Sequence, residues 1–167
     1  MRYEGKLYRT LNPIYAREPH SGRGAALHGG RFNPKAIPAL YCSLSVTTAI
    51  KEASQAGALQ PTTLVSYEAD IGSVLDSRDE AALERFGMSA AGLAAPDWRD
   101  RMKARGKAPT QLFAETLVAE GFQGLLVQSF ARGASDDDLN LVLWKWGEKP
   151  PSRLVLIDDE GRLIPRA

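Results

Sequence analysis

A glycine-rich stretch near the N-terminus gathers the side chains that best suit an anion. Residues 21–33 read SGRGAALHGGRFN, and both histidines of the chain, His20 and His28, stand in or beside this stretch. Glycine lets a backbone approach a ligand closely, and the arginine guanidinium is a planar donor that matches phosphate geometry. We therefore predict a loop that binds phosphate or diphosphate. A solvated basic loop is the alternative, because the stretch lacks the lysine and the spacing of a P-loop.

Glu52 is the second candidate for chemistry. Ser45 is predicted to cap a helix that ends near Gly57, with an apolar face made by residues 46, 49, 50 and 53. Glu52 falls on the flank of that face, on the same side as Ser45 and Thr48. A carboxylate in this position either faces a cleft beside the core or is an ordinary solvated glutamate.

Three further features carry polar or aromatic groups. Ser129 ends an apolar strand, a place from which side chains are often delivered to a site, although a serine there can also bond locally. Tyr41 is either a core aromatic or a platform for a ligand. The acidic run from Asp136 to Asp138 is predicted to be a solvated turn, since no companion ligands show the spacing of a calcium loop.

The spacing of apolar residues predicts the strands and helices that must position these residues. Strands are expected at residues 6–10, 39–43, 62–71, 124–129, 139–146 and 153–157. The strand at 62–71 places its apolar residues 65, 67, 69 and 71 on one face. Two or three short helices are expected within 79–106 and a longer one at 110–120, ended by Gly121, whereas residues 11–38 are predicted to be irregular. Strands at both ends of the chain and helices gathered in its middle predict an α+β fold.

Composition limits the classes of function. The 167 residues suit a single domain spanning 1–167, and 21 Lys and Arg against 20 Asp and Glu give a net charge of +1. This balance argues against nucleic-acid binding. One cysteine and two histidines cannot fill a zinc site of about four ligands without carboxylates, so no metal is predicted. No secretory signal and no apolar run of ~20 residues is present, so we expect a cytoplasmic protein without membrane contact.

The order of the candidate residues resembles the RES-domain family, named for its arginine, glutamate and serine. The resemblance runs through Tyr8-Arg9, the HGGRFN segment at 28–33, Leu40-Tyr41, Glu52 and Gln128-Ser129, and it covers about residues 6–157. The family implies a toxin encoded beside an antitoxin, with a mixed β core similar to that of ADP-ribosyltransferase toxins. The compact size is similar to that of the ParT-type members, and the implied substrate is NAD⁺.

The resemblance also implies roles for single residues around the nicotinamide end of NAD⁺. Glu52 corresponds to the family glutamate beside the ribose, and Ser129 to the serine that bonds the ribose or the carboxamide. Tyr41 corresponds to the tyrosine that offers an aromatic face to nicotinamide.

The other end of the implied site binds the diphosphate. Arg31 corresponds to the family arginine, with Gly30 beside it and Arg9 as a further basic residue near the phosphates. Phe32 stands where many relatives have tryptophan, and a short acidic loop with Asn140 replaces a longer proline-containing segment. Both departures concern the acceptor and the rim of the pocket.

The function expected from this resemblance is NAD⁺ cleavage with transfer of ADP-ribose to a cellular protein, and a cognate antitoxin is the expected partner. An NAD⁺ glycohydrolase or phosphorylase is the alternative. More distant alternatives are a ribonuclease-type toxin using His20, His28 and Arg31, and a non-catalytic nucleotide-binding module. No metal is required, because nicotinamide leaves as a neutral group from a ring that is already cationic.

Overall fold

Strands from both ends of the chain meet in one sheet. In the computed structural model, which describes residues 1–55 and 57–164, seven strands form a sheet in the order β4-β5-β6-β2-β1-β3-β7. The strands are β1 Tyr3–Leu11, β2 Leu40–Ser43, β3 Thr63–Ile71, β4 Val74–Asp76, β5 Gly124–Gln128, β6 Leu139–Leu143 and β7 Ser152–Leu156. Among these strands of the described chain, only β4 and β5 pair in parallel.

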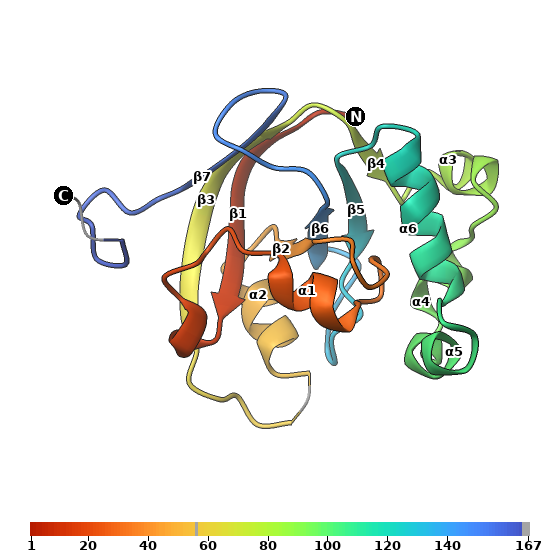
Figure 1. Cartoon of the computed structure of the whole chain (residues 1–167), viewed down its shortest axis with the longest axis horizontal. Helices are drawn as coiled ribbons and strands as arrows, with labels where there is room; N and C mark the ends of the chain where they lie inside the picture. Colours follow the sequence, from red (N-terminus) through yellow and green to blue (C-terminus); the bar gives the residue numbers. More distant parts are fainter. Residues whose placement is uncertain (56, 165–167) are drawn as a thin grey trace.

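The sheet divides into two halves between β1 and β2. β1 pairs with β3 along its whole length, from Tyr3 opposite Ile71 to Leu11 opposite Thr63. Its register with β2 contains only the pair Tyr8 and Ser43. The group β1-β3-β7 therefore diverges from the group β2-β6-β5-β4, as Figure 1 shows.

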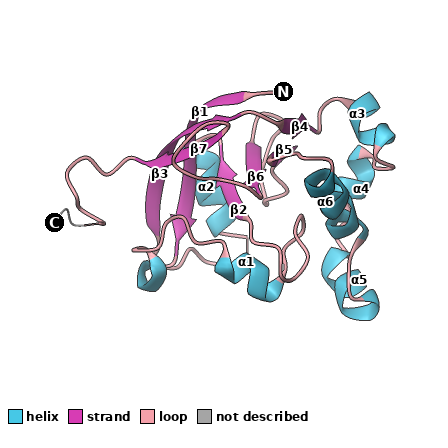
Figure 2. Ribbon diagram, turned by 45° about the horizontal axis from the view of Figure 1, so that its top comes forward, coloured by secondary structure: helices cyan, strands magenta, loops and turns pink. Residues whose placement is uncertain are grey.

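The helices lie in two places. They are α1 Arg23–His28, α2 Val46–Ala53, α3 Glu80–Arg85, α4 Ala90–Ala94, α5 Trp98–Arg105 and α6 Pro109–Ala119, with a 3-10 turn at Pro13–Tyr15. Figure 2 shows α3 to α6 gathered at one side of the molecule, whereas α1 and α2 lie close to β1 and β2. Among the described residues, no helix combines the length and the apolar composition that a membrane crossing requires.

Two apolar clusters stabilise this arrangement. One joins the two halves of the sheet and includes Leu7, Leu40, Tyr67, Leu141 and Leu154, each 0 or 1% exposed. The other packs α3, α4 and α6 against β4, β5 and β6. Fully burying a large apolar side chain contributes about 1.5–3 kcal/mol, so these clusters dominate the packing energy.

The α+β fold with helices in the middle of the chain is confirmed, since α3 to α6 all lie between β4 and β5 in sequence. The apolar face predicted for residues 62–71 is confirmed as well, with Tyr67, Ala69 and Ile71 buried. The prediction that residues 11–38 are irregular is wrong over α1. This helix has only six residues and is bounded by Gly22 and by Gly29, whose φ of 74° ends it.

Candidate active site

Helix α2 presents Glu52 on its flank, as predicted. Ser45 caps the helix by accepting a hydrogen bond from the Thr48 backbone N at 3.0 Å, and Thr48 and Ala49 are buried. Glu52 is half-buried because it lies beside this buried face. The helix ends at Ala53, before the predicted Gly57.

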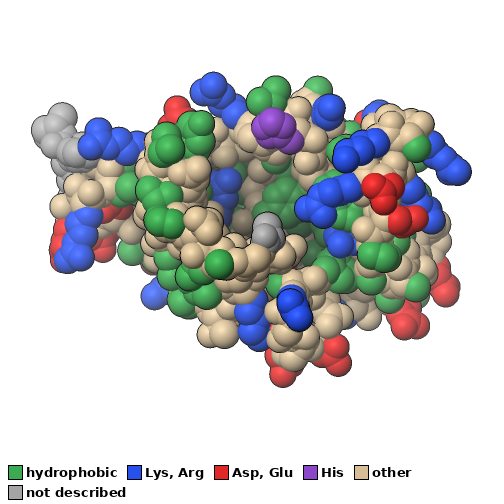
Figure 3. All heavy atoms as spheres, turned by 90° about the horizontal axis from the view of Figure 1, so that it is seen from below, with side chains coloured by type: hydrophobic (Ala, Val, Ile, Leu, Met, Phe, Trp, Pro, Cys, Tyr) green, Lys and Arg blue, Asp and Glu red, His purple; other side chains and the backbone are tan. Residues whose placement is uncertain are grey.

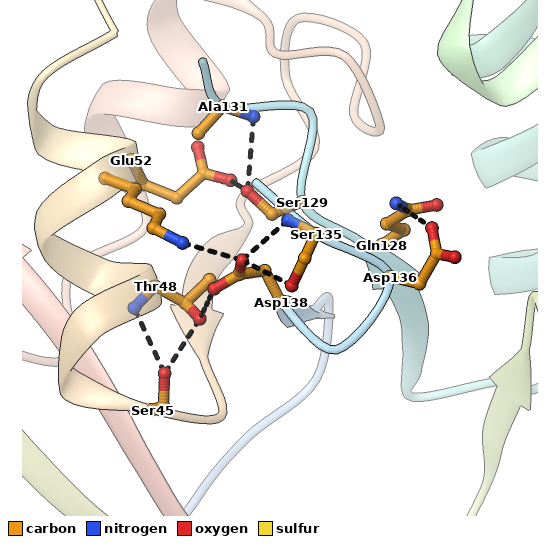
Figure 4. A network of polar contacts seen from close by, with 10 residues as sticks. Ser45, Thr48, Glu52, Gln128, Ser129, Ala131, Ser135, Asp136 and Asp138 are labelled. Carbon is orange, nitrogen blue, oxygen red and sulfur yellow. Dashed lines mark hydrogen bonds and ion pairs between the residues drawn. The ribbon is translucent and has the colours of Figure 1, made fainter. Parts of the chain in front are cut away.

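The Glu52 carboxylate is held by neutral donors. Ser129 Oγ donates to Glu52 Oε1 at 2.5 Å, Asn140 Nδ2 donates to the same oxygen, and Gln55 Nε2 donates to Oε2. Figure 4 shows Glu52 and Ser129 pointing toward one another from α2 and from the loop after β5. Among the described residues, no Lys, Arg or His nitrogen lies within 4.0 Å of this carboxylate.

The two donors that share Oε1 are themselves fixed. Ser129 is 3% exposed, and its Oγ accepts a hydrogen bond from the Ala131 backbone N at 3.2 Å. Asn140 Oδ1 accepts from Ser43 Oγ at 2.7 Å, because β2 and β6 place Asn140 directly opposite Ser43. The sequence pointed to Asn140 only as part of an acidic loop, since its contact depends on a strand pairing that no local pattern reveals.

The prediction that residues 136–138 form a solvated turn is wrong for Asp138. Its side chain is buried and accepts hydrogen bonds from Thr48 Oγ1 at 2.6 Å, Lys51 Nζ at 2.8 Å and the Ser135 backbone N at 2.7 Å. The hydrogen bond from Lys51 is the largest cause that holds the pKa of Asp138 well below its usual range. Asp136 remains exposed. The acidic loop is thus fastened to α2 through one carboxylate (Figure 4).

Arg31 lies half-buried at the same site. Its Nη1 donates to the backbone carbonyls of Leu93 at 3.1 Å and Ala95 at 2.8 Å, and its Cζ lies 4.6 Å from the centre of the Phe130 ring. Burial lowers the pKa of Arg31, whereas the charge of Glu52 acts in the opposite direction. The predicted arginine and glutamate therefore interact across the site.

Tyr41 combines a fixed hydroxyl with an accessible ring. The hydroxyl donates to Asn33 Oδ1 at 2.6 Å and accepts from the Phe32 backbone N at 3.1 Å, while 36% of the residue is exposed. Burial raises the pKa of this hydroxyl. Gly30 lies against it, and a Cβ at this position would overlap both the Tyr41 hydroxyl and Asn33 Oδ1. Glycine is thus required here by packing.

Arg9 lines a cleft between β1 and α1. This cleft of about 750 Å³ is lined by residues that include Arg9, Tyr15, Arg23 and His28. Figure 3 shows the hollowed face, with basic side chains around the hollow. Arg9 donates through Nη1 to Pro19 O at 3.0 Å and through Nη2 to a second carbonyl at 3.4 Å. Arg9 therefore holds the loop between β1 and α1.

The two histidines face different hollows. His20 Nε2 lies 3.2 Å from Leu154 O, and the ring packs edge-on against Tyr67. It lines a separate hollow of about 590 Å³ beside β7, and burial lowers the pKa of His20. His28 is exposed and lines the same cleft as Arg9. A histidine pair acting together on RNA has no common site in this arrangement.

The chain is similar to a known family in sequence and to a solved structure in fold. The model of the RES domain matches residues 6–165. No curated protein matches the sequence. A chain in the crystal structure of the M. tuberculosis MbcT–MbcA toxin–antitoxin complex superposes with a TM-score of 0.69 at 23% identity, covering 95% of this chain and 84% of that one. At this level of identity the likeness concerns the fold.

Proposed function

The chain belongs to the RES domain family, and from this premise we propose that it is the toxin of a toxin–antitoxin pair that cleaves the nicotinamide–ribose bond of NAD⁺. A chain of similar fold comes from a complex described as toxin and antitoxin, which supports the first part. The second part is carried by one observation: among the described residues, no cation forms an ion pair with the Glu52 carboxylate within 4.0 Å.

The reaction needs a negative charge that is fixed but not neutralised. When the bond between the ribose C1′ and the pyridinium nitrogen breaks, the electron pair goes to nitrogen and leaves neutral nicotinamide. The ribose becomes a cation resembling an oxocarbenium ion. Glu52 can stabilise this cation, because Ser129, Asn140 and Gln55 orient its carboxylate without supplying a formal positive charge.

Other residues of the site suit the rest of the NAD⁺ molecule. The exposed ring of Tyr41 offers a face to nicotinamide, since its hydroxyl is already engaged with Asn33. Arg31 is assigned to the diphosphate. Arg9 lines a cleft of about 750 Å³, within the range of roughly 300–1,000 Å³ that is usual for ligand pockets, whereas Glu52 and Arg31 lie outside the lining of this cleft.

We assign transfer of ADP-ribose to a side chain of a cellular protein as the second half of the reaction. The acceptor nucleophile forms a bond to C1′ and gives up its proton, so only the acceptor distinguishes transfer from hydrolysis or phosphorolysis. The cognate antitoxin is expected to inhibit by covering the cleft.

The test is incubation of the pure protein with NAD⁺ labelled in the adenylate part, with and without cell extract and inorganic phosphate. We expect nicotinamide release and label on a protein band. Free ADP-ribose or its phosphate ester as the sole labelled product would overturn protein transfer but keep cleavage. If no nicotinamide is released under any condition, the proposed activity is wrong.

The variant Glu52→Ala separates an enzyme from a binding module. We expect this folded variant to lose both nicotinamide release and growth inhibition when it is expressed in cells. A non-catalytic module that acts by binding alone would keep its growth inhibition.

A further inference from the structure

Arg31 has a second arginine beside it, on helix α5. The Cζ of Arg99 lies 4.5 Å from the centre of the Trp98 ring, and the Cζ of Arg31 lies 5.8 Å from the same ring. The two guanidinium groups are therefore held by one indole. They also repel each other, since the charge of Arg99 adds to burial, the larger cause, in lowering the pKa of Arg31.

Among the described residues, neither of these arginines forms an ion pair, although the charge of Glu52 attracts Arg31 from a greater distance. Within residues 1–55 and 57–164, no carboxylate oxygen lies within 4.0 Å of Arg31 or Arg99. The next arginine along α5 differs, because Arg101 forms an ion pair with Asp97 at 2.7 Å. Two like charges placed together without a counterion favour an anion between or beside them.

Arg31 also keeps a free donor edge. In the part of the chain that the structure describes, it donates hydrogen bonds only through Nη1, so Nε and Nη2 have no acceptor. Arg99 is exposed and can reach solvent. Arg9, by contrast, already uses both of its amino groups to hold backbone carbonyls of the loop after β1.

We propose that Arg31 and Arg99, positioned by Trp98, form a two-guanidinium site for the diphosphate of a nucleoside diphosphate group. In this arrangement Arg99 is the second donor to the phosphates, a role that the sequence had suggested for Arg9. Only the identification of this diphosphate as that of NAD⁺ rests on the proposed function, whereas the binding of a diphosphate does not. Figure 3 shows basic side chains beside the hollow on the side of the helices.

The test is titration calorimetry with ADP, which carries the diphosphate without a bond to be cleaved. We expect Arg99→Ala to weaken ADP binding about tenfold, the size of one charge-assisted hydrogen bond. The affinity of Arg99→Lys for ADP should lie between those of the wild type and Arg99→Ala, because a lysine keeps the charge but loses the planar donor fork. Arg101→Ala is the matched control on the same helix and should bind ADP like the wild type.

Adenosine serves as the ligand without phosphates. Its affinity, or lack of measurable affinity, should be the same for the wild type and for Arg99→Ala, and the melting temperatures should agree. The proposal is overturned if the wild type does not bind ADP, if Arg99→Ala binds ADP as tightly as the wild type, or if adenosine affinity falls equally. NAD⁺ cleavage is measured separately, so a protein that binds ADP through Arg99 but releases no nicotinamide contradicts the proposed function alone.

Discussion

Two carboxylates of the site differ in whether a positively charged side chain pairs with them. Asp138 pairs with Lys51 at 2.8 Å, so its charge is used to hold the structure together. Glu52 accepts hydrogen bonds from neutral side chains, among them Ser129 and Asn140, so its charge stays available to a substrate. Glu52 on α2 and Asp138 beside α2 thus have different chemistry, because their hydrogen-bond partners differ in charge.

Replacing Glu52 by glutamine tests the charge alone. The substituted side chain keeps its size and an oxygen that accepts from Ser129, but it loses the negative charge. Glu52→Gln should therefore lower the rate of nicotinamide release about a hundredfold or more, as loss of an electrostatic group does in other active sites. Glu84→Gln, on the exposed surface of α3, is the control and should keep the wild-type rate. A Glu52→Gln enzyme within a factor of about two of wild type would contradict this role.

The Tyr41 hydroxyl is predicted to leave no room for a side chain at position 30, so that only glycine fits there without strain. In Gly30→Ala the new methyl group meets both Tyr41 and Asn33, so we expect a loss of about 1–3 kcal/mol in the free energy of unfolding. Urea denaturation measures it. Gly24→Ala in helix α1 is the matched control, because a Cβ at this position has no neighbouring atom within 4 Å. This substitution should leave the free energy of unfolding unchanged or raise it. Equal stability of the Gly30→Ala protein and the wild type would show that this neighbourhood can relax.

At the scale of elements, helix α2 depends on its neighbours for its position. It has only eight residues, and isolated helices shorter than ~12 residues are marginal in water. Asp138 connects it to the loop that follows β5 by binding Thr48 and Lys51 from the helix and Ser135 from the loop. The same loop begins with Ser129, whose backbone N donates to Asp138 O at 2.7 Å. Asp138 therefore fastens the loop that carries Ser129 to the helix that carries Glu52, through its carboxylate on one side and its backbone carbonyl on the other.

Asp138→Asn should loosen this connection without touching the substrate. We expect a lower melting temperature at pH 7 and a lower kcat with little change in KM, because Glu52 loses its orientation while the binding residues remain. The folded-state pKa of Asp138 lies below its unfolded value of about 3.9, so its stabilisation is complete above that pH and is lost as the pH falls further.

The difference in melting temperature between wild type and Asp138→Asn should therefore be larger at pH 7 than at pH 3. Scanning calorimetry at both values measures it. Asp136→Asn is the control, since Asp136 is exposed and lies in the same loop. A difference that does not change with pH would contradict the assigned role of the carboxylate charge.

The elements that the sequence predicted best are those with local signals. Ser45 predicts the start of α2 by its cap, and the alternation around Tyr67 predicts β3 and its buried face. Helix α1 could not be predicted in this way, because six residues between glycines give no periodic pattern. Asn140 and Asp138 were missed as site residues because their partners lie 88 and 90 positions away in the chain. Such contacts depend on how the strands pair.

At the scale of the whole molecule, side-chain packing joins two halves of the sheet that backbone pairing barely connects. The two halves of the sheet share only the pair Tyr8 and Ser43 in the register of β1 and β2. The apolar cluster between them takes Leu7 from one half and Leu40 and Leu141 from the other. Helix α2 contacts both β1 and β2, so Glu52 lies where the two halves of the sheet diverge (Figure 1), and the geometry of the site depends on this cluster.

Leu7→Ala tests whether the halves unfold together. Leu7 is 0% exposed, so its truncation should cost about 2–5 kcal/mol in the free energy of unfolding. Leu64→Ala in β3, where 39% of the residue is exposed, is the control and should cost much less. Urea denaturation is followed by tryptophan fluorescence, which reports on the surroundings of Trp98, Trp144 and Trp146, and by far-ultraviolet circular dichroism, which reports on the backbone of the whole chain. Because one cluster joins the halves, the two signals should change together in wild type and in Leu7→Ala. Separate transitions would mean that β1-β3-β7 and the remaining strands unfold independently, and the site between them would then be lost with the first half to unfold.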